Sequence, residues 1–210
     1  MFPMQTSYVW IPVFGYLLGS IPFGLMLGKT FGKADVRTVG SGNIGATNVA
    51  RVAGTFAGML TLALDATKGA AAVWIAARFT NDSAGWMVAA GLAALVGHCF
   101  PMWLKFHGGK GVATAAGLFL ALCPWALASS LSLFIIVVVV SRYVSLGSIA
   151  AAASMPLFVY LLWAPQHAPP PVVDFGAFAA AILVIYKHDA NIQRLVEGRE
   201  PRFGKKQDGG

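Results

Sequence analysis

Charged residues are scarce in this sequence. Asp, Glu, Lys and Arg make up 11% of its 210 residues, whereas a soluble domain averages about 25%. Hydrophobic residues make up 57%, and the mean hydropathy is +0.69. Apolar runs of about 20 residues, the length at which a helix crosses a bilayer, recur along the chain. The composition therefore predicts an all-α, polytopic transmembrane helix bundle that forms a single integral membrane domain over residues 1–210.

Cysteine and metal-binding patterns are scarce as well. Cys99 and Cys123 both lie inside apolar stretches, which indicates packing residues and excludes a disulfide framework. No group of His, Cys and carboxylate residues has metal-ligand spacing, so we expect neither a metal nor a cofactor. The N-terminus lacks the basic start and small-residue cleavage site of a secretory signal, so the first apolar run is interpreted as a span.

Apolar runs predict spans over 8–28, 55–77, 85–104, 149–163 and 175–186. The run 112–141 is either one long tilted helix or two short ones, because Pro124 near its middle cannot donate the backbone hydrogen bond of a continuous helix.

The basic residues give the topology. The net charge is +7, but the basic residues lie between apolar runs rather than along one face, so we expect no nucleic-acid partner. They concentrate in loops at about 29–53, 105–114 and 142–148 and in the tail 187–210. Because basic loops stay cytoplasmic, these segments should share one face. This requires an even number of crossings between them, and hence two short helices between residues 112 and 141. The prediction is about seven spans, with the N-terminus outside and the C-terminus cytoplasmic; five spans plus a re-entrant pair is the alternative.

The first of these loops contains VGSGNIGATNVAR, which includes a G-x-G-x-x-G spacing. A dinucleotide site needs a strand before this spacing and a βαβ unit around it, and apolar helical runs flank it here instead. The glycines nevertheless let backbone N–H groups approach an anion, and the neighbouring polar side chains add donors. The segment is either a flexible connector or, as we favour, a phosphate site formed by Gly40, Ser41, Gly42, Asn43, Gly45, Thr47, Asn48 and Arg51.

The second loop, KFHGGKGVAT, surrounds one lysine with glycines. It is not a Walker loop, because Lys110 is followed by glycine. Gly108, Gly109 and Gly111 resemble a nest, a concave arrangement of backbone N–H groups that binds anions. A basic topology anchor is the alternative, although lysine alone would suffice for that, so the glycines favour an anion site.

Ionisable residues also occur in the tail and inside two spans. His188, Asn191 and Arg194 are spaced by three, so they would share one face of a short interfacial helix. A purely anchoring amphipathic helix is the alternative for the tail. Asp65 and Lys68 can pair on one helical face, and we interpret them as a buried structural ion pair, with His98 as a packing residue.

The segments GSGNIGATNVAR, GGKGVAT and HDANIQRLVEGRE together resemble those of the bacterial acyl-phosphate:glycerol-3-phosphate acyltransferases, in the same order and across nearly the whole chain. No H-x-x-x-x-D pattern, expected of many CoA-dependent glycerolipid acyltransferases, is present. The resemblance implies an inner-membrane enzyme with a cytoplasmic active site and no cofactor. It would acylate the 1-hydroxyl of glycerol 3-phosphate with acyl phosphate, yielding lysophosphatidic acid and inorganic phosphate. An upstream enzyme would supply the acyl phosphate, and the chain would be a monomer or homodimer.

The resemblance also implies roles for individual residues. Ser41, Lys110 and His188 would be catalytic. Asn191 and Arg194 would bind glycerol 3-phosphate from the tail, with Ser145 as a further candidate. Either His188 or a substrate phosphate would take the hydroxyl proton. Small residues at 117, 121 and 147 would leave room for the acyl chain. A transporter for small anions is the rival function, because glycine-lined breaks and buried ion pairs also occur there.

Overall fold

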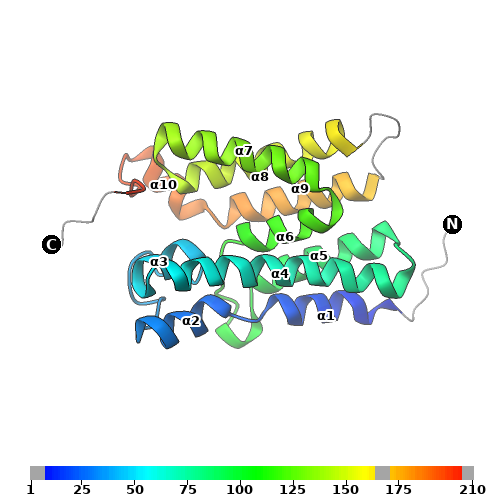
Figure 1. The fold of residues 1–210 in the computed structure, drawn as a ribbon, viewed down its shortest axis with the longest axis horizontal. Coiled ribbons are helices and arrows are strands. Elements are labelled where there is room, and N and C mark those ends of the chain that lie inside the picture. Colours follow the sequence, from blue (N-terminus) through cyan, green and yellow to red (C-terminus); the bar gives the residue numbers. More distant parts are fainter. Residues whose placement is uncertain (1–7, 164–170, 205–210) are drawn as a thin grey trace.

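The computed structural model describes residues 8–163 and 171–204. Every regular element in these residues is a helix, and most of the helices run along the long axis of the molecule (Figure 1). The all-α prediction is therefore confirmed. The proline-rich turn predicted after the span 149–163 lies largely outside the described residues, as do the last six residues of the tail.

The helices follow the predicted apolar runs with several shifted ends. They are α1 (Trp10–Gly19), α2 (Phe23–Gly32), α3 (Ala46–Ala53), α4 (Thr55–Thr80), α5 (Ala84–Cys99), the 3-10 turn η2 (Met102–Leu104), α6 (Val112–Leu122), α7 (Pro124–Ser141), α8 (Val144–Trp163), α9 (Pro171–Tyr186) and α10 (Asp189–Val196).

Two of the predicted loops are shorter than expected. The first span does not end at residue 28: it breaks before Pro22 and resumes as α2, because proline cannot donate a helical hydrogen bond. Residues 29–32 therefore belong to a helix, as do residues 46–53. The third loop is also shorter, since α8 begins at Val144 and places Ser145 in its first turn.

The ambiguous run 112–141 forms two helices, as predicted, and Pro124 is the first residue of the second. Five helical segments are long and apolar enough to cross a membrane: Trp10–Gly32, Thr55–Thr80, Ala84–Leu104, Pro124–Ser141 and Val144–Leu162. A sixth is added if α9 and α10, which are bent by 58°, count as one span. With 11 residues, α6 extends only about 16 Å, about half of a bilayer core. The predicted seven crossings and their orientation stay predictions.

Small residues bring the helix backbones close together. A Cβ atom at Gly19 would lie 2.0 Å from the Ala94 carbonyl oxygen, and one at Gly117 would lie 1.8 Å from that of Ala66. Such contacts join α1 to α5 and α6 to α4, as expected where helices associate by close packing in lipid. By contrast, Val139 and Val140 on α7 are 72% and 80% exposed, which suits a surface that faces lipid.

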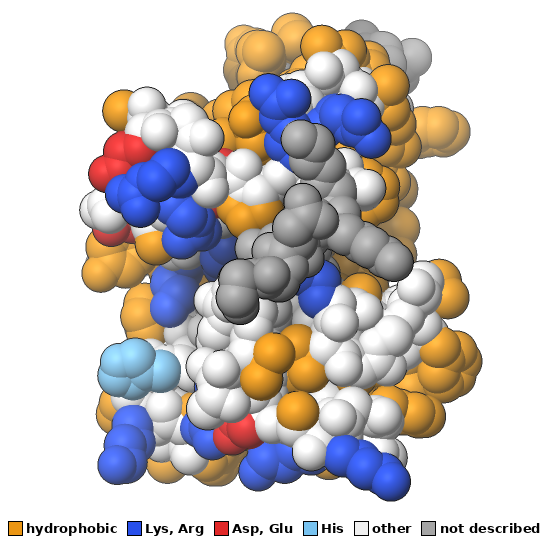
Figure 2. Space-filling view, turned by 90° about the vertical axis from the view of Figure 1, so that its left-hand side faces the viewer, with side chains coloured by type: hydrophobic (Ala, Val, Ile, Leu, Met, Phe, Trp, Pro, Cys, Tyr) orange, Lys and Arg blue, Asp and Glu red, His pale blue; other side chains and the backbone are white. Residues whose placement is uncertain are grey.

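The polar motif segments gather at one end of the bundle. Figure 1 shows α2, α3 and α10 at the end opposite the start of α1. Figure 2, which views that end, shows several groups of Lys and Arg side chains on it. All four predicted basic segments carry exposed basic residues within the described chain, namely Lys29, Lys33, Arg37, Lys105, Arg142, Arg199 and Arg202. This clustering agrees with the expectation that these segments share one membrane face.

Candidate active site

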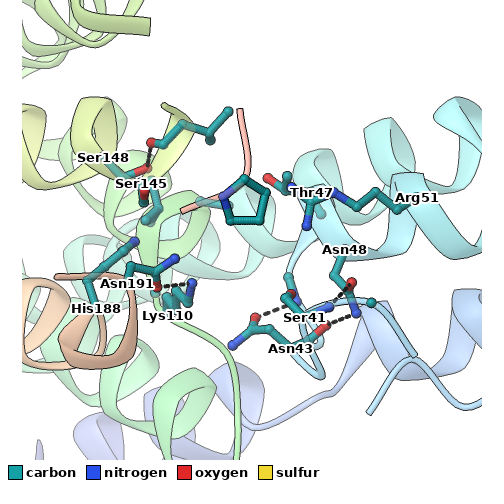
Figure 3. Close-up of a pocket in the computed structure, with 18 of the residues that line it drawn as sticks. Ser41, Asn43, Thr47, Asn48, Arg51, Lys110, Ser145, Ser148, His188 and Asn191 are labelled. Atoms are coloured by element: carbon teal, nitrogen blue, oxygen red, sulfur yellow. Dashed lines mark hydrogen bonds between the residues drawn. The ribbon is translucent and has the colours of Figure 1, made fainter. Parts of the chain in front are cut away.

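A cavity of about 490 Å³ lies between the motif segments. Most residues that the sequence singled out line it, from the first loop and α3, the second loop, α8 and the tail. They are Gly40, Ser41, Asn43, Gly45, Thr47, Asn48, Arg51, Lys110, Gly111, Ser145, His188, Asn191 and Arg194. Figure 3 shows Ser41 and Thr47 on one side, facing Lys110, Asn191 and His188 on the other. Gly42, Gly108 and Gly109 do not line the cavity.

Asn48 organises the first loop. Its buried side-chain Nδ2 donates to the carbonyl oxygens of Val36 at 2.8 Å, Asn43 at 2.9 Å and Val39 at 3.1 Å, and its Oδ1 accepts from the Ser41 N–H at 2.9 Å. The amide has no donor left for a ligand. Asn48 therefore shapes the loop, rather than donating to substrate as the sequence interpretation expected.

The glycines of the first loop allow a backbone shape that few other residues adopt. Gly40 and Gly42 have φ values of +65° and +68°, in the left-handed region. A Cβ atom at Gly40 would also lie 2.3 Å from Asn48 Oδ1. The Gly42 N–H donates to the Val39 carbonyl oxygen at 3.2 Å, so Gly42 turns the chain instead of binding an anion.

The second loop is not the expected anion nest. The Gly108 N–H donates to the Cys99 carbonyl oxygen and the Gly109 N–H to that of His98, both at 3.1 Å. These two N–H groups are therefore not available to a phosphate. Gly111, with φ of +82°, lines the cavity and forms the N-cap of α6.

Lys110 projects into the cavity and donates a hydrogen bond to Asn191 Oδ1 (Figure 3). Burial lowers the pKa of Lys110 to about 8; Glu200 opposes this shift, while the nearby cations Arg194 and Arg51 reinforce it. The ammonium is thus charged at neutral pH and sits where a phosphate would be attracted. Within the described residues, Arg51 has no acidic partner.

The backbone of α9 fixes the orientation of the His188 ring. Its Nδ1 donates to the Val184 carbonyl oxygen at 2.7 Å, which leaves Nε2 as an acceptor. Burial lowers the pKa of His188 to about 4, although the Val184 carbonyl opposes the shift, and Lys110 lowers it further. The side chain can therefore accept a hydrogen bond from a hydroxyl, but it is a weak base.

Glu200, which the sequence interpretation missed, joins the tail residues. Its carboxylate accepts from Asn191 Nδ2 and from Arg194 Nε, both at 2.7 Å. Burial raises the pKa of Glu200, but the Ser145 hydroxyl beside it and the bonds from Asn191 and Arg194 outweigh this and lower it. The sequence did contain a signal for Glu200, because an acidic residue stands out in a strongly basic tail.

Four helices begin at the cavity. Gly45, the N-cap of α3, lines it, as do Gly111 before α6, Val144 at the start of α8, and His188 before α10. The N-termini of α3, α6 and α10 have no side-chain cap. Helix N-termini carry partial positive charge and free N–H groups, so several converging ones favour an anionic ligand.

Two residues inside the spans also reach the cavity wall, namely Asp65 and His98. Asp65 Oδ1 lies 2.8 Å from Lys68 Nζ, which confirms the predicted ion pair. The sequence interpretation placed these residues in structural roles only, and no local pattern marked their approach to the cavity. Ser148 and Arg199 are further lining residues that it missed.

An apolar groove of about 630 Å³ adjoins the polar cavity. The two share wall residues, including Arg51, Leu62 and Ser148, and the groove extends to Phe119 and Met155 in the bundle core. Residues 117, 121 and 147, where the sequence interpretation expected space for the chain, do not line it. Gly117 and Gly147 instead pack against α4 and α7.

Fold and site together define a membrane protein suited to ligands with an anionic head and an apolar chain. A family model described as glycerol-3-phosphate acyltransferase matches residues 9–198. The chain belongs to this glycerol-3-phosphate acyltransferase family, and it is an acyltransferase of the membrane.

Individual relatives agree with the family model over nearly their whole length. The chain is 48% identical to a glycerol-3-phosphate acyltransferase of Syntrophotalea carbinolica, covering 95% of this chain and 99% of the relative. It is 48% identical to that of Mesorhizobium japonicum, over 97% and 100%. A crystal structure of PlsY (YgiH), an integral membrane glycerol 3-phosphate acyltransferase in its glycerol 3-phosphate form, is 41% identical with a TM-score of 0.86, over 94% and 96% of the two chains. The lysophosphatidic acid form is 40% identical, with a TM-score of 0.85 and the same coverage.

Proposed function

We propose that this chain transfers an acyl group from acyl phosphate to the 1-hydroxyl of glycerol 3-phosphate, forming lysophosphatidic acid and inorganic phosphate. The observation that carries the proposal is the shared wall between a cation-lined cavity and an apolar groove. A soluble phosphate ester can occupy the cavity while an acyl chain occupies the groove. The acyl carbonyl then lies at the junction, within reach of the hydroxyl.

Electrostatics is the main problem that this site solves. Two phosphate-bearing substrates repel each other, and Arg51, Lys110 and Arg194 offset that repulsion together with the helix N-termini. Arg194 is already paired with Glu200, so Lys110 and Arg51 are the cations freer to contact phosphate. The site thus lowers the barrier by bringing the reactants together and by balancing charge.

In the reaction, the 1-hydroxyl oxygen attacks the acyl carbonyl carbon and forms the new ester bond. The bond between this carbon and the phosphate oxygen breaks, and inorganic phosphate leaves. Phosphate is a good leaving group, so the reaction does not depend on a strong general acid. This suits a cavity whose carboxylates, Asp65 and Glu200, are paired with cations.

The hydroxyl proton passes to a phosphate oxygen. His188, with a pKa of about 4, is a weaker base than a phosphate monoester dianion, whose pKa is about 6. His188 Nε2 accepts a hydrogen bond from the hydroxyl and orients it for attack. Ser41, at the opposite wall in Figure 3, donates to a substrate oxygen.

The cavity opens to the cytoplasm, and a separate enzyme supplies the acyl phosphate. The exposed basic residues at the cavity end support this orientation, because basic segments stay cytoplasmic. Both native cysteines are buried, so a single Lys33→Cys variant can report on which side of the membrane the cavity end lies. An impermeant maleimide should label it in inside-out vesicles but not in intact cells; labelling in intact cells only would reverse the orientation. The active form is a monomer or homodimer.

The direct test is to incubate the purified protein with palmitoyl phosphate and radiolabelled glycerol 3-phosphate, without CoA or metal. We expect labelled lysophosphatidic acid and an equal amount of inorganic phosphate. Lys110→Ala should lose about a hundredfold or more in kcat/KM for glycerol 3-phosphate, because it removes a cation that holds the phosphate in both the ground state and the transition state; removal of a single donor costs a similar factor elsewhere. Lys105→Ala is the matched control, since Lys105 is exposed and does not line the cavity.

Product from acyl-CoA but not from acyl phosphate would contradict the proposed donor. Labelled glycerol 3-phosphate that enters vesicles without being acylated would replace the enzyme function with transport.

A further inference from the structure

Three buried ionisable side chains, two of which reach the cavity wall, take no direct part in the mechanism above. Asp65 on α4 is 2% exposed, Lys68 is 3% exposed and His98 on α5 is 5% exposed. Asp65 Oδ1 lies 2.8 Å from Lys68 Nζ and 3.5 Å from His98 Nδ1. Burying such groups within a membrane domain is costly, so they mark a function or a structural constraint.

The cluster connects separate parts of the chain. Lys68 Nζ donates to the Ile21 carbonyl oxygen at 3.0 Å, at the break between α1 and α2. His98 Nδ1 faces the carboxylate and has no hydrogen-bond partner within the described residues. Asp65 therefore orients the ring by charge, across a distance too long for a good hydrogen bond.

The other edge of the ring lies against the second loop. A Cβ atom built at Gly109 would lie 2.1 Å from His98 Nε2, 2.8 Å from Cε1 and 3.0 Å from Cδ2. These three nearest atoms all belong to the His98 ring. The Gly109 N–H also donates to the His98 carbonyl oxygen, so both the backbone and the side chain of His98 hold this residue.

Lys110 is the next residue along the chain. Its ammonium must be placed against Asn191 and the cavity, while the preceding peptide is held against the His98 ring. A shift of the ring would move the Gly109–Lys110 peptide and therefore the lysine.

We propose that His98, oriented by Asp65, is a positioning residue for Lys110, and that Gly109 is a glycine because the His98 ring occupies the place of its side chain. The role of Gly109 is close packing, not donation of its N–H to phosphate. This inference rests on the proposed function, since it assigns the parts that place the cation of the glycerol 3-phosphate site.

Gly108 provides a matched control for the test. A Cβ atom at Gly108 would lie 2.1 Å from the His98 carbonyl oxygen, 2.5 Å from Pro101 Cδ and 2.9 Å from the Cys99 carbonyl oxygen. Two of these neighbours are backbone atoms, so shortening the His98 side chain cannot relieve them. A Cβ atom at Gly109, by contrast, would gain room from such a change.

The experiment combines Gly109→Ala and Gly108→Ala, each alone and together with His98→Asn. Asparagine keeps an amide near Nδ1 but removes the ring atoms that face Gly109. For each variant, kcat, the KM for glycerol 3-phosphate and the thermal unfolding temperature are measured. His98→Asn should raise this KM about tenfold with little change in kcat, as expected when ground-state and transition-state binding are lost equally.

Gly109→Ala should raise KM about tenfold or more in the wild-type background, yet add less than about twofold in the His98→Asn background. Gly108→Ala should cause its full loss in both backgrounds. Equal losses from Gly109→Ala in both backgrounds would overturn the inference, as would an unchanged KM for His98→Asn. If His98→Asn does not fold, His98→Ala takes its place in the same comparison.

Failure of the proposed function gives a different result. The wild type would then make no lysophosphatidic acid, while the unfolding temperatures of the same variants would still show whether His98→Asn relieves Gly109→Ala but not Gly108→Ala.

Discussion

Two glycine-rich segments border the cavity, residues 40–45 before α3 and residues 108–111 before α6. In the first, Gly40 and Gly42 adopt left-handed backbone conformations around the Asn48 side chain. In the second, Gly108 and Gly109 have ordinary backbone conformations, and contacts with Pro101 and His98 leave no room for side chains. The same residue type thus serves turn geometry in one segment and close packing in the other. Neither pair acts mainly as a phosphate nest.

The largest effect should come from the centre of the first segment. Asn48→Ala removes four hydrogen bonds, and each buried group left without a partner costs about 1–3 kcal/mol. We expect product formation to be abolished and the thermal unfolding temperature to fall. Asn43→Ala, which removes only the 2.8 Å bond from the Gly45 N–H, should have a much smaller effect. Comparable losses of activity in the two variants would contradict the conclusion that Asn48 holds the first loop in shape.

The cation of the second segment should limit activity at alkaline pH. Lys110 has a pKa of about 8 in the free protein, so its charge is lost as pH rises through this value. We expect kcat/KM to fall about tenfold per pH unit above it, because this parameter reports groups in the free enzyme. Lys110→Arg should remove this alkaline limb, since a guanidinium stays charged. An unchanged limb in Lys110→Arg would assign it to another group.

A smaller effect is expected at His188, which lies on the same side of the cavity as Lys110 (Figure 3). If His188 orients the hydroxyl, His188→Gln should raise the KM for glycerol 3-phosphate about tenfold and leave kcat within about threefold. His107→Gln is the control, because His107 is exposed and lies outside the cavity. A collapse of kcat in His188→Gln would show instead that the imidazole takes the proton.

The smallest effect should follow Gly42→Ala. Its φ of +68° is unfavourable for alanine by about 1–2 kcal/mol, but a Cβ atom there would have only one neighbour within 4 Å, the Arg37 carbonyl oxygen at 3.2 Å. We expect a slightly lower unfolding temperature and turnover close to wild type. Gly40→Ala should be far worse, because its Cβ would also strike the Asn48 amide. Equal losses of turnover and stability in Gly40→Ala and Gly42→Ala would mean that backbone strain alone, and not contact with Asn48, requires glycine in the first segment.

Most of the fold could be predicted because apolar length and proline position are local signals. Pro124 separated α6 from α7 as expected, whereas the signal of Pro22 was overlooked inside an apolar run. The start of α8 could not be read because Val144 and Ser145 suit either a loop or a helix. The start of α6 at Val112 depends on how residues 98–111 pack against the bundle. No local sequence pattern encodes that packing.

The sequence indicated most of the residues that line the cavity, but it did not indicate what each of them contacts. Short polar motifs in a chain poor in polar groups pointed to Lys110, His188 and Asn191, and the fold brings these three residues to one cavity. By contrast, Asn48 and Gly109 were assigned to substrate because their partners, the Val36 carbonyl and the His98 ring, lie outside the motifs that contain them. Sequence spacing alone does not reveal such neighbours.

The bonding of Asn48 has a consequence for recognition. Three carbonyl groups and one N–H are already satisfied by a single amide, so the first loop is ordered before any ligand arrives. Its conformational entropy is lost during folding and not during binding, which is the advantage of a preorganised site. Affinity for a small, flexible phosphate ester then depends on the contacts that the loop and its neighbours already present.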